Sequence, residues 1–224
     1  MQHKRMSDLH GHIERSVPPG SSIDPSVWSA MAMMHEPLSV GGVIRKLWSG
    51  EASLYRDHLS RLAPDDRRLR FGMDAADDAI AAHAAKAFGG GAVIHGFFID
   101  GVLRGAAELH ILGSKPPVEA EIAFSVEAEY RNSGVGSALF GRTLLVARNR
   151  GVATVTMSCL PSNRPMQSLA KKFEAKIKYN LADVIGELKT PGPTPISLWR
   201  EMVTDGTDLA ASLMDVQVRA LRVD

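Results

Sequence analysis

The sequence predicts an α/β protein built on a mixed, mostly antiparallel β-sheet that is flanked by helices. Asp100-Gly101 separates two apolar β-type runs, a pattern typical of a tight hairpin because both residues tolerate positive φ. A third β-type run leads through a glycine-rich loop into an amphipathic helix, and further β-type segments follow. Antiparallel strands followed by alternating strands and helices indicate an α/β fold with a mixed sheet.

The length and composition bound the function. The chain has 224 residues, of which 45% are hydrophobic and 23% charged, the ordinary balance of a soluble globular protein. Its formal net charge is +1, so there is no domain-wide basic excess that would indicate nucleic acid or an anionic membrane as partner. An anionic ligand must therefore be bound by a local group of residues. We expect a cytoplasmic protein, because the chain has one cysteine, no long apolar run and a polar N-terminus without a signal peptide. A homodimer is left open.

The two ends of the chain differ from its middle. Residues 1–39 hold four helix-breaking prolines and no sustained periodicity, so we expect a disordered or loosely docked tail. A start codon placed too far upstream is the alternative. We expect the folded domain to span residues 40–190 and residues 191–224 to form a proline-rich linker and a C-terminal helix, interrupted at Gly206.

The first half of the domain contains helices and then a hairpin. We expect a strand near 43–48, a helix ending at Leu62, a charge-rich helix end or loop at 65–71, an alanine-rich helix at 75–88, and hairpin strands at 92–99 and 102–112. In the second hairpin strand Arg104, Glu108 and His110 share one face, and apolar side chains occupy the other.

The second half alternates strands and helices. We expect strands at 119–126, 153–160, 175–179 and 184–188, and helices at 134–150 and 164–173. On the first of these strands, Ile122 and Phe124 lie on one face, and Glu121 and Ser125 lie on the other.

The segment that carries the chemistry lies between a strand and a helix. It reads Arg131, Asn132, Ser133, Gly134, Val135, Gly136 and Ser137. Its glycines let the backbone approach a ligand closely, and the first N–H groups of the following helix form an anion site suited to a pyrophosphate. A Rossmann fingerprint fails because Leu139 stands near the place of the third glycine, and a P-loop fails because Gly-Lys-Ser/Thr is missing. An ordinary glycine-rich turn remains open.

Arg131, Gly134 and Gly136 match the Arg/Gln-x-x-Gly-x-Gly/Ala loop of the GCN5-related N-acetyltransferases, the GNAT family. The chain resembles this family over about residues 42–190, because the hairpin, loop and long helix come in the family's order. Residues 163–173, which begin with Asn163, resemble the family's second motif, and residues 65–71 resemble an Arg-x-Arg-Phe segment of bacterial members close to protein-lysine acetyltransferases.

The resemblance implies a sheet that splays into a V between the third and fourth strands and the fifth, with acetyl-CoA bound in the V. The pantetheine would bond to the backbone near Phe124, Ser125 and Val126, and the amides from Arg131 to Ser137 would wrap the pyrophosphate. Asn163 would reach the pantetheine or the acceptor. The reaction would move an acetyl group directly to a primary amine, of a protein lysine or a small molecule, without a metal.

The acceptor amine must lose a proton, and because a free lysine has a pKa of about 10.4 a base is expected. In the protein-lysine branch a glutamate before the loop has this role, and Glu121 occupies that place; a solvated strand carboxylate is the alternative. Glu108 and His110 are reserve candidates. Ala170 stands where many members have the tyrosine that protonates the thiolate, and Tyr179 is its candidate substitute. The missing tyrosine keeps open a rival function, a non-catalytic acyl-CoA-binding or scaffolding domain.

Overall fold

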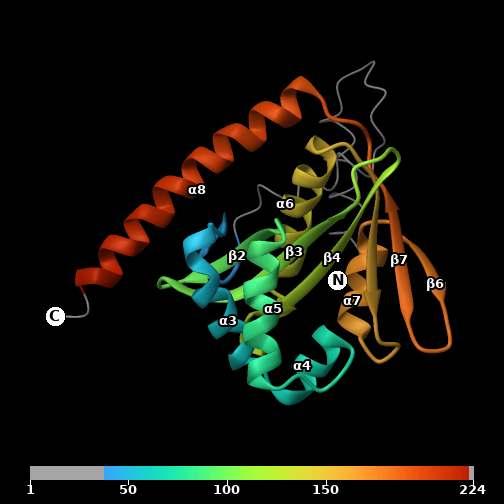
Figure 1. Cartoon of the computed structure of the whole chain (residues 1–224), viewed down its shortest axis with the longest axis horizontal. Coiled ribbons are helices and arrows are strands. Elements are labelled where there is room, and N and C mark those ends of the chain that lie inside the picture. The colour runs from blue at the N-terminus through green and yellow to red at the C-terminus, as the bar shows by residue number, and fades with distance from the viewer. Residues whose placement is uncertain (1–37, 222–224) are drawn as a thin grey trace, which may run out of the picture.

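The computed structural model describes residues 38–221, with side chains described as far as Asp215 (Figure 1). Seven strands form one sheet in the order β1-β2-β3-β4-β5-β7-β6. Their bounds are β1 Val43–Lys46, β2 Val93–Ile99, β3 Val102–Leu112, β4 Val118–Val126, β5 Val152–Cys159, β6 Lys176–Tyr179 and β7 Val184–Lys189. All neighbouring pairs are antiparallel except β4 and β5. The expected mixed, mostly antiparallel sheet is confirmed.

Helices cover both faces of this sheet. Their bounds are η2 Ser49–Glu51, α3 Ala52–Arg61, α4 Pro64–Phe71, α5 Asp77–Gly89, η3 Ala128–Tyr130, α6 Val135–Asn149, α7 Arg164–Lys172 and α8 Pro195–Leu221. One apolar core joins α3 and α5 to side chains of β2 and β3, and a second joins α6 and α7 to β4 and β5. The sheet is therefore the middle layer between two helical layers. No helix in residues 38–221 is long and apolar enough to cross a membrane.

The hairpin between β2 and β3 forms as the sequence predicts. Asp100 and Gly101 have φ values of 51° and 75°, the left-handed conformation that the turn requires. The register then places His110 opposite Glu121, and Glu108 opposite Ala123. Directly opposed residues of an antiparallel pair point to the same side of the sheet. Glu108, His110, Glu121 and Ser125 therefore share the face that α3, α4 and α5 cover.

The sheet splays between β4 and β5. Their parallel ladder runs only from Val118 opposite Val152 to Glu121 opposite Thr156. Beyond this fork β4 continues beside β3 as far as Val126, and β5 continues beside β7 as far as Cys159. Among residues 38–221, one edge of β4 after Glu121 thus has no strand partner, which is the V that the resemblance implied.

Two local expectations need correction. Residues 65–71, expected as a helix end or loop, form the helix α4: Pro64 stands in its first turn, where its missing N–H costs nothing, and Gly72 ends it with φ of 74°. The expected interruption at Gly206 is wrong, because α8 continues through it. A single glycine costs a helix only about 1 kcal/mol, and the contacts on both sides of Gly206 outweigh that cost. The expected tail lies, except for its last two residues, outside the described residues.

Candidate active site

A cavity of about 570 Å³ opens beside the part of β4 that has separated from β5. Its walls come from the α3–α4 junction, the end of β4, the loop before α6, and α7. The cavity is lined by nine of the residues that the sequence marks as candidates: Phe124, Ser125, Val126, Arg131, Asn132, Gly134, Gly136, Ser137 and Asn163. Segments about 100 residues apart in the chain therefore meet where the resemblance implied a coenzyme site.

The N-terminus of α6 forms one end of this cavity. Gly134 is its N-cap with φ of 89°, no side chain of the described residues caps the helix, and the first turn contains no acidic residue. The Nζ atom of Lys172 on α7 lies 2.9 Å from the Oγ atom of Ser137 in that first turn. A helix N-terminus carries partial positive charge and favours anions. A cation beside it is unfavourable unless an anion binds between them, so this end of the cavity is built for a negatively charged group.

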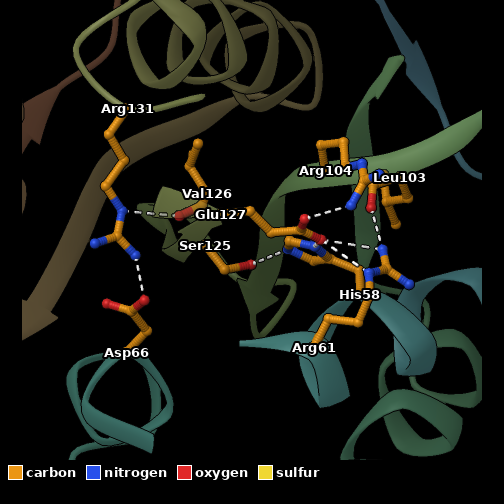
Figure 2. A network of polar contacts seen from close by, with 9 residues as sticks. All are labelled: His58, Arg61, Asp66, Leu103, Arg104, Ser125, Val126, Glu127 and Arg131. Carbon is orange, nitrogen blue, oxygen red and sulfur yellow. Dashed lines mark hydrogen bonds and ion pairs between the residues drawn. The ribbon is translucent and has the colours of Figure 1, made fainter. Parts of the chain in front are cut away.

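The cavity lining as a whole is cationic. Among its described residues, the charged ones are Arg70, Arg131, Arg164 and Lys172 against one carboxylate, Asp66. Arg131 spans the end of β4: its Nε atom donates to the carbonyl oxygen of Val126 at 2.9 Å, and its guanidinium pairs with Asp66 of α4 at 2.6 Å (Figure 2). The Arg131 side chain thereby joins α4 to β4 and forms one wall of the cavity.

Three of the predicted ligand residues have structural roles. Asn163 caps α7, because its Oδ1 atom accepts from the backbone N–H of Met166 at 3.1 Å, and its Nδ2 atom donates to the carbonyl oxygen of Leu69 at 3.4 Å. Ser133 and Val135 do not line the cavity. The Ser133 hydroxyl donates to the carbonyl oxygen of Tyr130, and the Val135 side chain is buried in the core. What Ser133 and Val135 contribute to an anion site is backbone geometry.

A chain of polar contacts leads from the cavity into the interior (Figure 2). Ser125 on β4 lines the cavity, and its Oγ atom lies 2.9 Å from Nε2 of His58 on α3. The other ring nitrogen of His58 lies 3.1 Å from Glu127. Glu127 also accepts from Arg61 at 3.1 Å and from Arg104 at 2.8 Å. These contacts clamp α3 onto the end of β4, which fixes the position of Ser125.

Burial and hydrogen bonding determine the protonation of this chain. Burial lowers the pKa of His58, so its imidazole is neutral at pH 7. Burial raises the pKa of Glu127, but hydrogen bonds from His58 and Arg104 outweigh it and bring the pKa to about 2. A neutral His58 that donates from Nδ1 to the Glu127 carboxylate presents Nε2 as an acceptor for the Ser125 hydroxyl. The order of donors and acceptors is that of a proton relay.

Glu108 lies at the centre of a second network on the same face of the sheet. It is 1% exposed and contacts the Tyr55 hydroxyl at 2.7 Å, His83 at 3.0 Å and His110 at 2.6 Å, and it pairs with Arg70. Burial raises its pKa, but hydrogen bonds from His110 and His83 and the charge of Arg70 hold that pKa far below its usual range. The bond to Glu108 raises the pKa of His110. A carboxylate whose pKa is held far below its usual range is a weak base, so Glu108 is poorly suited to proton removal. A raised pKa makes the neutral imidazole of His110 a stronger base, so His110 remains a reserve candidate.

Glu121 lies at the fork itself. It is exposed, is the last β4 residue paired with β5, and stands opposite His110 on β3. It is not among the residues that line the cavity, which begins three residues further along β4. Its charge acts on both Arg70 and His110.

Neither residue considered for protonation of the leaving group is at the cavity. Ala170 is 3% exposed and points into the core, where its Cβ atom lies 3.3 Å from the position a Cβ on Gly186 of β7 would take. Tyr179, at the end of β6, is 64% exposed. Neither residue lines the cavity, and its described lining contains no tyrosine.

Sequence reasoning gave no site role to the cavity wall that α4 and α7 contribute beyond Asn163. The missed residues with polar side chains are Asp66, Arg70, Arg164, Ser168 and Lys172, together with His58 behind Ser125. Arg164 and Lys172, eight residues apart on one helix, share a helical face, and this spacing was a usable signal. Nothing in the local sequence pairs His58 with Ser125, which lies 67 residues away.

Solved structures share this architecture. The GNAT domain of a Streptomyces lividans protein called PAT is 22% identical and matches 69% of this chain and 94% of its own, with a TM-score of 0.60. The yncA protein of Salmonella typhimurium, a putative acetyltransferase solved with its cofactor acetyl-CoA, is 15% identical over 68% of this chain and 95% of its own, with a TM-score of 0.51. RimL, a ribosomal L7/L12 α-N-protein acetyltransferase solved with coenzyme A, is 11% identical over 66% and 93%, with a TM-score of 0.50.

At these identities the likeness to solved structures establishes the fold. The sequence itself gives the closer assignment. A model of the acetyltransferase (GNAT) family matches residues 55–174, more than half of the chain, so the chain belongs to this family, and the fold and the enzyme class expected from its sequence are confirmed.

Proposed function

We propose that this protein transfers the acetyl group of acetyl-CoA directly to a primary amine. The observation that carries the proposal is the ammonium group of Lys172 beside the N-terminus of α6, at the end of a cavity that also contains Arg131 and Arg164. This arrangement suits a pyrophosphate, the anionic group of coenzyme A. Two structures of the same fold hold acetyl-CoA or coenzyme A.

The rest of the coenzyme would extend along β4. After Glu121 one edge of β4 has no strand partner in the described part of the chain, and Phe124, Ser125 and Val126 lie at the cavity. Free backbone N–H and C=O groups on a strand edge can bond to the two amides of a pantetheine arm as to an added strand. The thioester would then lie towards the fork, near Glu121.

In the reaction the amine nitrogen forms a bond to the thioester carbonyl carbon, the carbon–sulfur bond breaks, and coenzyme A leaves as its thiolate. A thiol pKa near 8.5 makes this thiolate a tolerable leaving group without an acid from the protein. The amine proton needs an acceptor, and we retain Glu121 because it is exposed at the fork. The relay of Ser125, His58 and Glu127 supports a second candidate, since a neutral imidazole lies one hydroxyl away from the cavity.

Two substitutions separate the candidate bases. Glu121→Gln and His58→Gln each preserve much of the side-chain shape and remove one proton acceptor. Removal of the true base should reduce kcat by about 10²–10⁴-fold, leave the acetyl-CoA affinity nearly unchanged, and allow partial recovery at high pH. A variant that keeps near-wild-type turnover at neutral pH identifies its residue as a bystander. If both variants keep it, the base lies elsewhere.

The binding site is tested without turnover. Lys172→Gln removes the ammonium group from the α6 N-terminus, and Lys171→Gln is a matched control on the same helix at an exposed position outside the cavity. At 100 times its dissociation constant acetyl-CoA adds about 2.7 kcal/mol to wild-type stability. We expect Lys172→Gln to melt without ligand at or above the wild-type Tm and to gain less from acetyl-CoA than wild type or the control. Equal gains in all three proteins would refute the assigned anion site.

The acceptor amine is tested separately. The test measures thiol release from acetyl-CoA with peptides that carry a free lysine and with small amines, and the comparison distinguishes the two acceptor classes. We propose that the protein acts in the cytoplasm. Stabilisation by acetyl-CoA with no thiol release from any amine would support the rival function, an acyl-CoA-binding domain without catalysis.

A further inference from the structure

The C-terminal helix α8 faces the rest of the protein with its charged side. Four of its acidic residues form ion pairs with the body: Glu201 with Arg150 at 3.5 Å, Asp205 with Lys46 at 2.9 Å, Asp208 with Arg142 at 2.5 Å, and Asp215 with Arg45 at 3.1 Å. These contacts attach α8 to β1 and α6. In an ordinary surface helix the apolar side faces the core and the charged side faces water. In α8 the two sides are exchanged.

The outward side of α8 is correspondingly apolar. Its large side chains are Ile196, Leu198, Trp199, Met202, Val203, Leu209, Leu213 and Met214, and each is between 45% and 67% exposed. We call these eight residues the α8 apolar face. On the order of 100 Å² of each side chain is accessible, so the face exceeds the roughly 300–600 Å² that the largest apolar patch of a monomer covers. Figure 1 shows α8 at the periphery of the molecule.

This face is arranged symmetrically about Gly206. Trp199 and Leu213 each lie seven residues from the glycine, and Val203 and Leu209 each lie three residues from it. Met202 and the small residue Ala210 each lie four residues away. Gly206 is exposed, and a Cβ atom added to it would meet nothing within 4 Å. The described fold therefore gives no reason for a glycine that costs the helix about 1 kcal/mol relative to alanine.

We propose that the α8 apolar face is the interface of a homodimer in which two α8 helices cross antiparallel, with a twofold axis at Gly206. The axis would bring Trp199 of each copy against the partner's Leu213. The missing Cβ of Gly206 would let the two backbones approach closely at the crossing point. A self-complementary patch is what a twofold interface requires.

The area and charge of α8 favour a second copy over other occupants. Eight half-exposed large side chains approach the roughly 800 Å² per partner that a specific interface buries. Helices that bind lipid carry lysine and arginine on their polar side, whereas α8 carries mainly carboxylates there. A segment from residues 1–37 that covered the face would have no twofold symmetry. The repetition of the apolar pattern on both sides of Gly206 therefore favours a second copy of α8 over such a segment.

The first test is the mass of the full-length protein in solution. Light scattering and sedimentation should give a dimer that dissociates on dilution. Leu213→Glu introduces a charge at the interface and should weaken dimerisation at least tenfold. Leu181→Glu is the matched control, because Leu181 is fully exposed and lies outside α8, and it should leave the dimer intact.

The second test locates the axis with cysteine cross-links under mild oxidation. Because the proposed crossing places position 199 of one copy against position 213 of the other, the double variant Trp199→Cys, Leu213→Cys should give a disulfide-linked dimer on a non-reducing gel. The two positions are 14 residues apart on one helix, about 21 Å, so they cannot form a disulfide within one copy. Leu198→Cys should give none, because eight residues on each side of the axis separate the two copies by about 24 Å. Wild type is the background control, since its single Cys159 is buried. Cross-linking of both variants would indicate parallel helices and overturn the geometry.

Three results would overturn the proposal itself. Wild type could remain a monomer at about 100 μM. Deletion of residues 1–37 could convert a monomer into a dimer, which would make those residues the natural cover of the face. Wild type could bind vesicles of anionic phospholipid in a manner that Leu213→Glu abolishes, which would make the occupant a membrane.

Discussion

The ionised carboxylate of Glu127 stabilises the end of β4, and the pH dependence of unfolding tests this contribution quantitatively. This carboxylate accepts from His58, Arg61 and Arg104, and its pKa is about 2, compared with 4.5 for a free glutamate. Because the pKa in the folded state is depressed, the stabilisation is fully present above about pH 4.5 and is lost as the pH falls through 2. This difference in pKa corresponds to at most about 3.4 kcal/mol. Arg61 is 37% exposed, so solvent screening reduces this value.

Glu127→Gln should therefore lower the free energy of unfolding by about 2 kcal/mol at pH 7. Urea unfolding followed by tryptophan fluorescence gives this value, and the slope against urea should not change. The gap between wild type and variant should narrow as the pH falls from 5 to 3, because the Glu127 carboxyl takes up a proton in the unfolded chain over this range while it stays ionised in the folded protein. Glu129→Gln, at the exposed neighbouring position, should behave as wild type. A gap that stays constant over this pH range would refute the assignment of the stabilisation to the ionised carboxylate.

Three further predictions concern the cavity and the tail. Gly134→Ala should cost about 1 kcal/mol of stability, because residue 134 has φ of 89°, and it should also reduce the thermal shift caused by acetyl-CoA. Ala170→Tyr should destabilise the fold by about 1–3 kcal/mol without increasing turnover, since that position points into the core, whereas Met166→Tyr at the cavity should be better tolerated in melting experiments. Deletion of residues 1–37 should preserve the stabilisation by acetyl-CoA; its loss in melts of the truncated protein would show that those residues belong to the binding site.

The elements that the sequence predicts correctly are those with local causes. The hairpin follows from Asp100 and Gly101, and the loop before α6 follows from Gly134 and a helix that begins directly after it. In these cases the residues that determine the conformation are neighbours in the chain, so a local pattern is sufficient. The α4 helix was harder to predict because it has no buried residue that would give an apolar period.

The polar part of the site could not be read in the same way. Glu108 and His110 are neighbours on one strand face, which is why the sequence marks them as candidate bases. Their protonation depends on Arg70, His83 and Tyr55, which come from three separate helices. Ala170 shows the same limit, because a motif gives its position along α7 but not the side of the helix that the cavity occupies.

Although the net charge is near zero, positive and negative side chains lie in different parts of the molecule, and this separation connects the proposed coenzyme site with the proposed dimer. Four cations and one carboxylate line the cavity, whereas four carboxylates of α8 are held against arginine and lysine residues of β1 and α6. Those acids pair with cations outside the cavity, so they do not occupy the cations of the cavity, which we propose bind the anionic coenzyme. The same attachment turns the α8 apolar face outward, where only another surface can remove it from water. The cavity lining and the α8 apolar face share no residue, so a variant such as Leu213→Glu should separate ligand binding from self-association, with the dimer lost and the acetyl-CoA thermal shift retained.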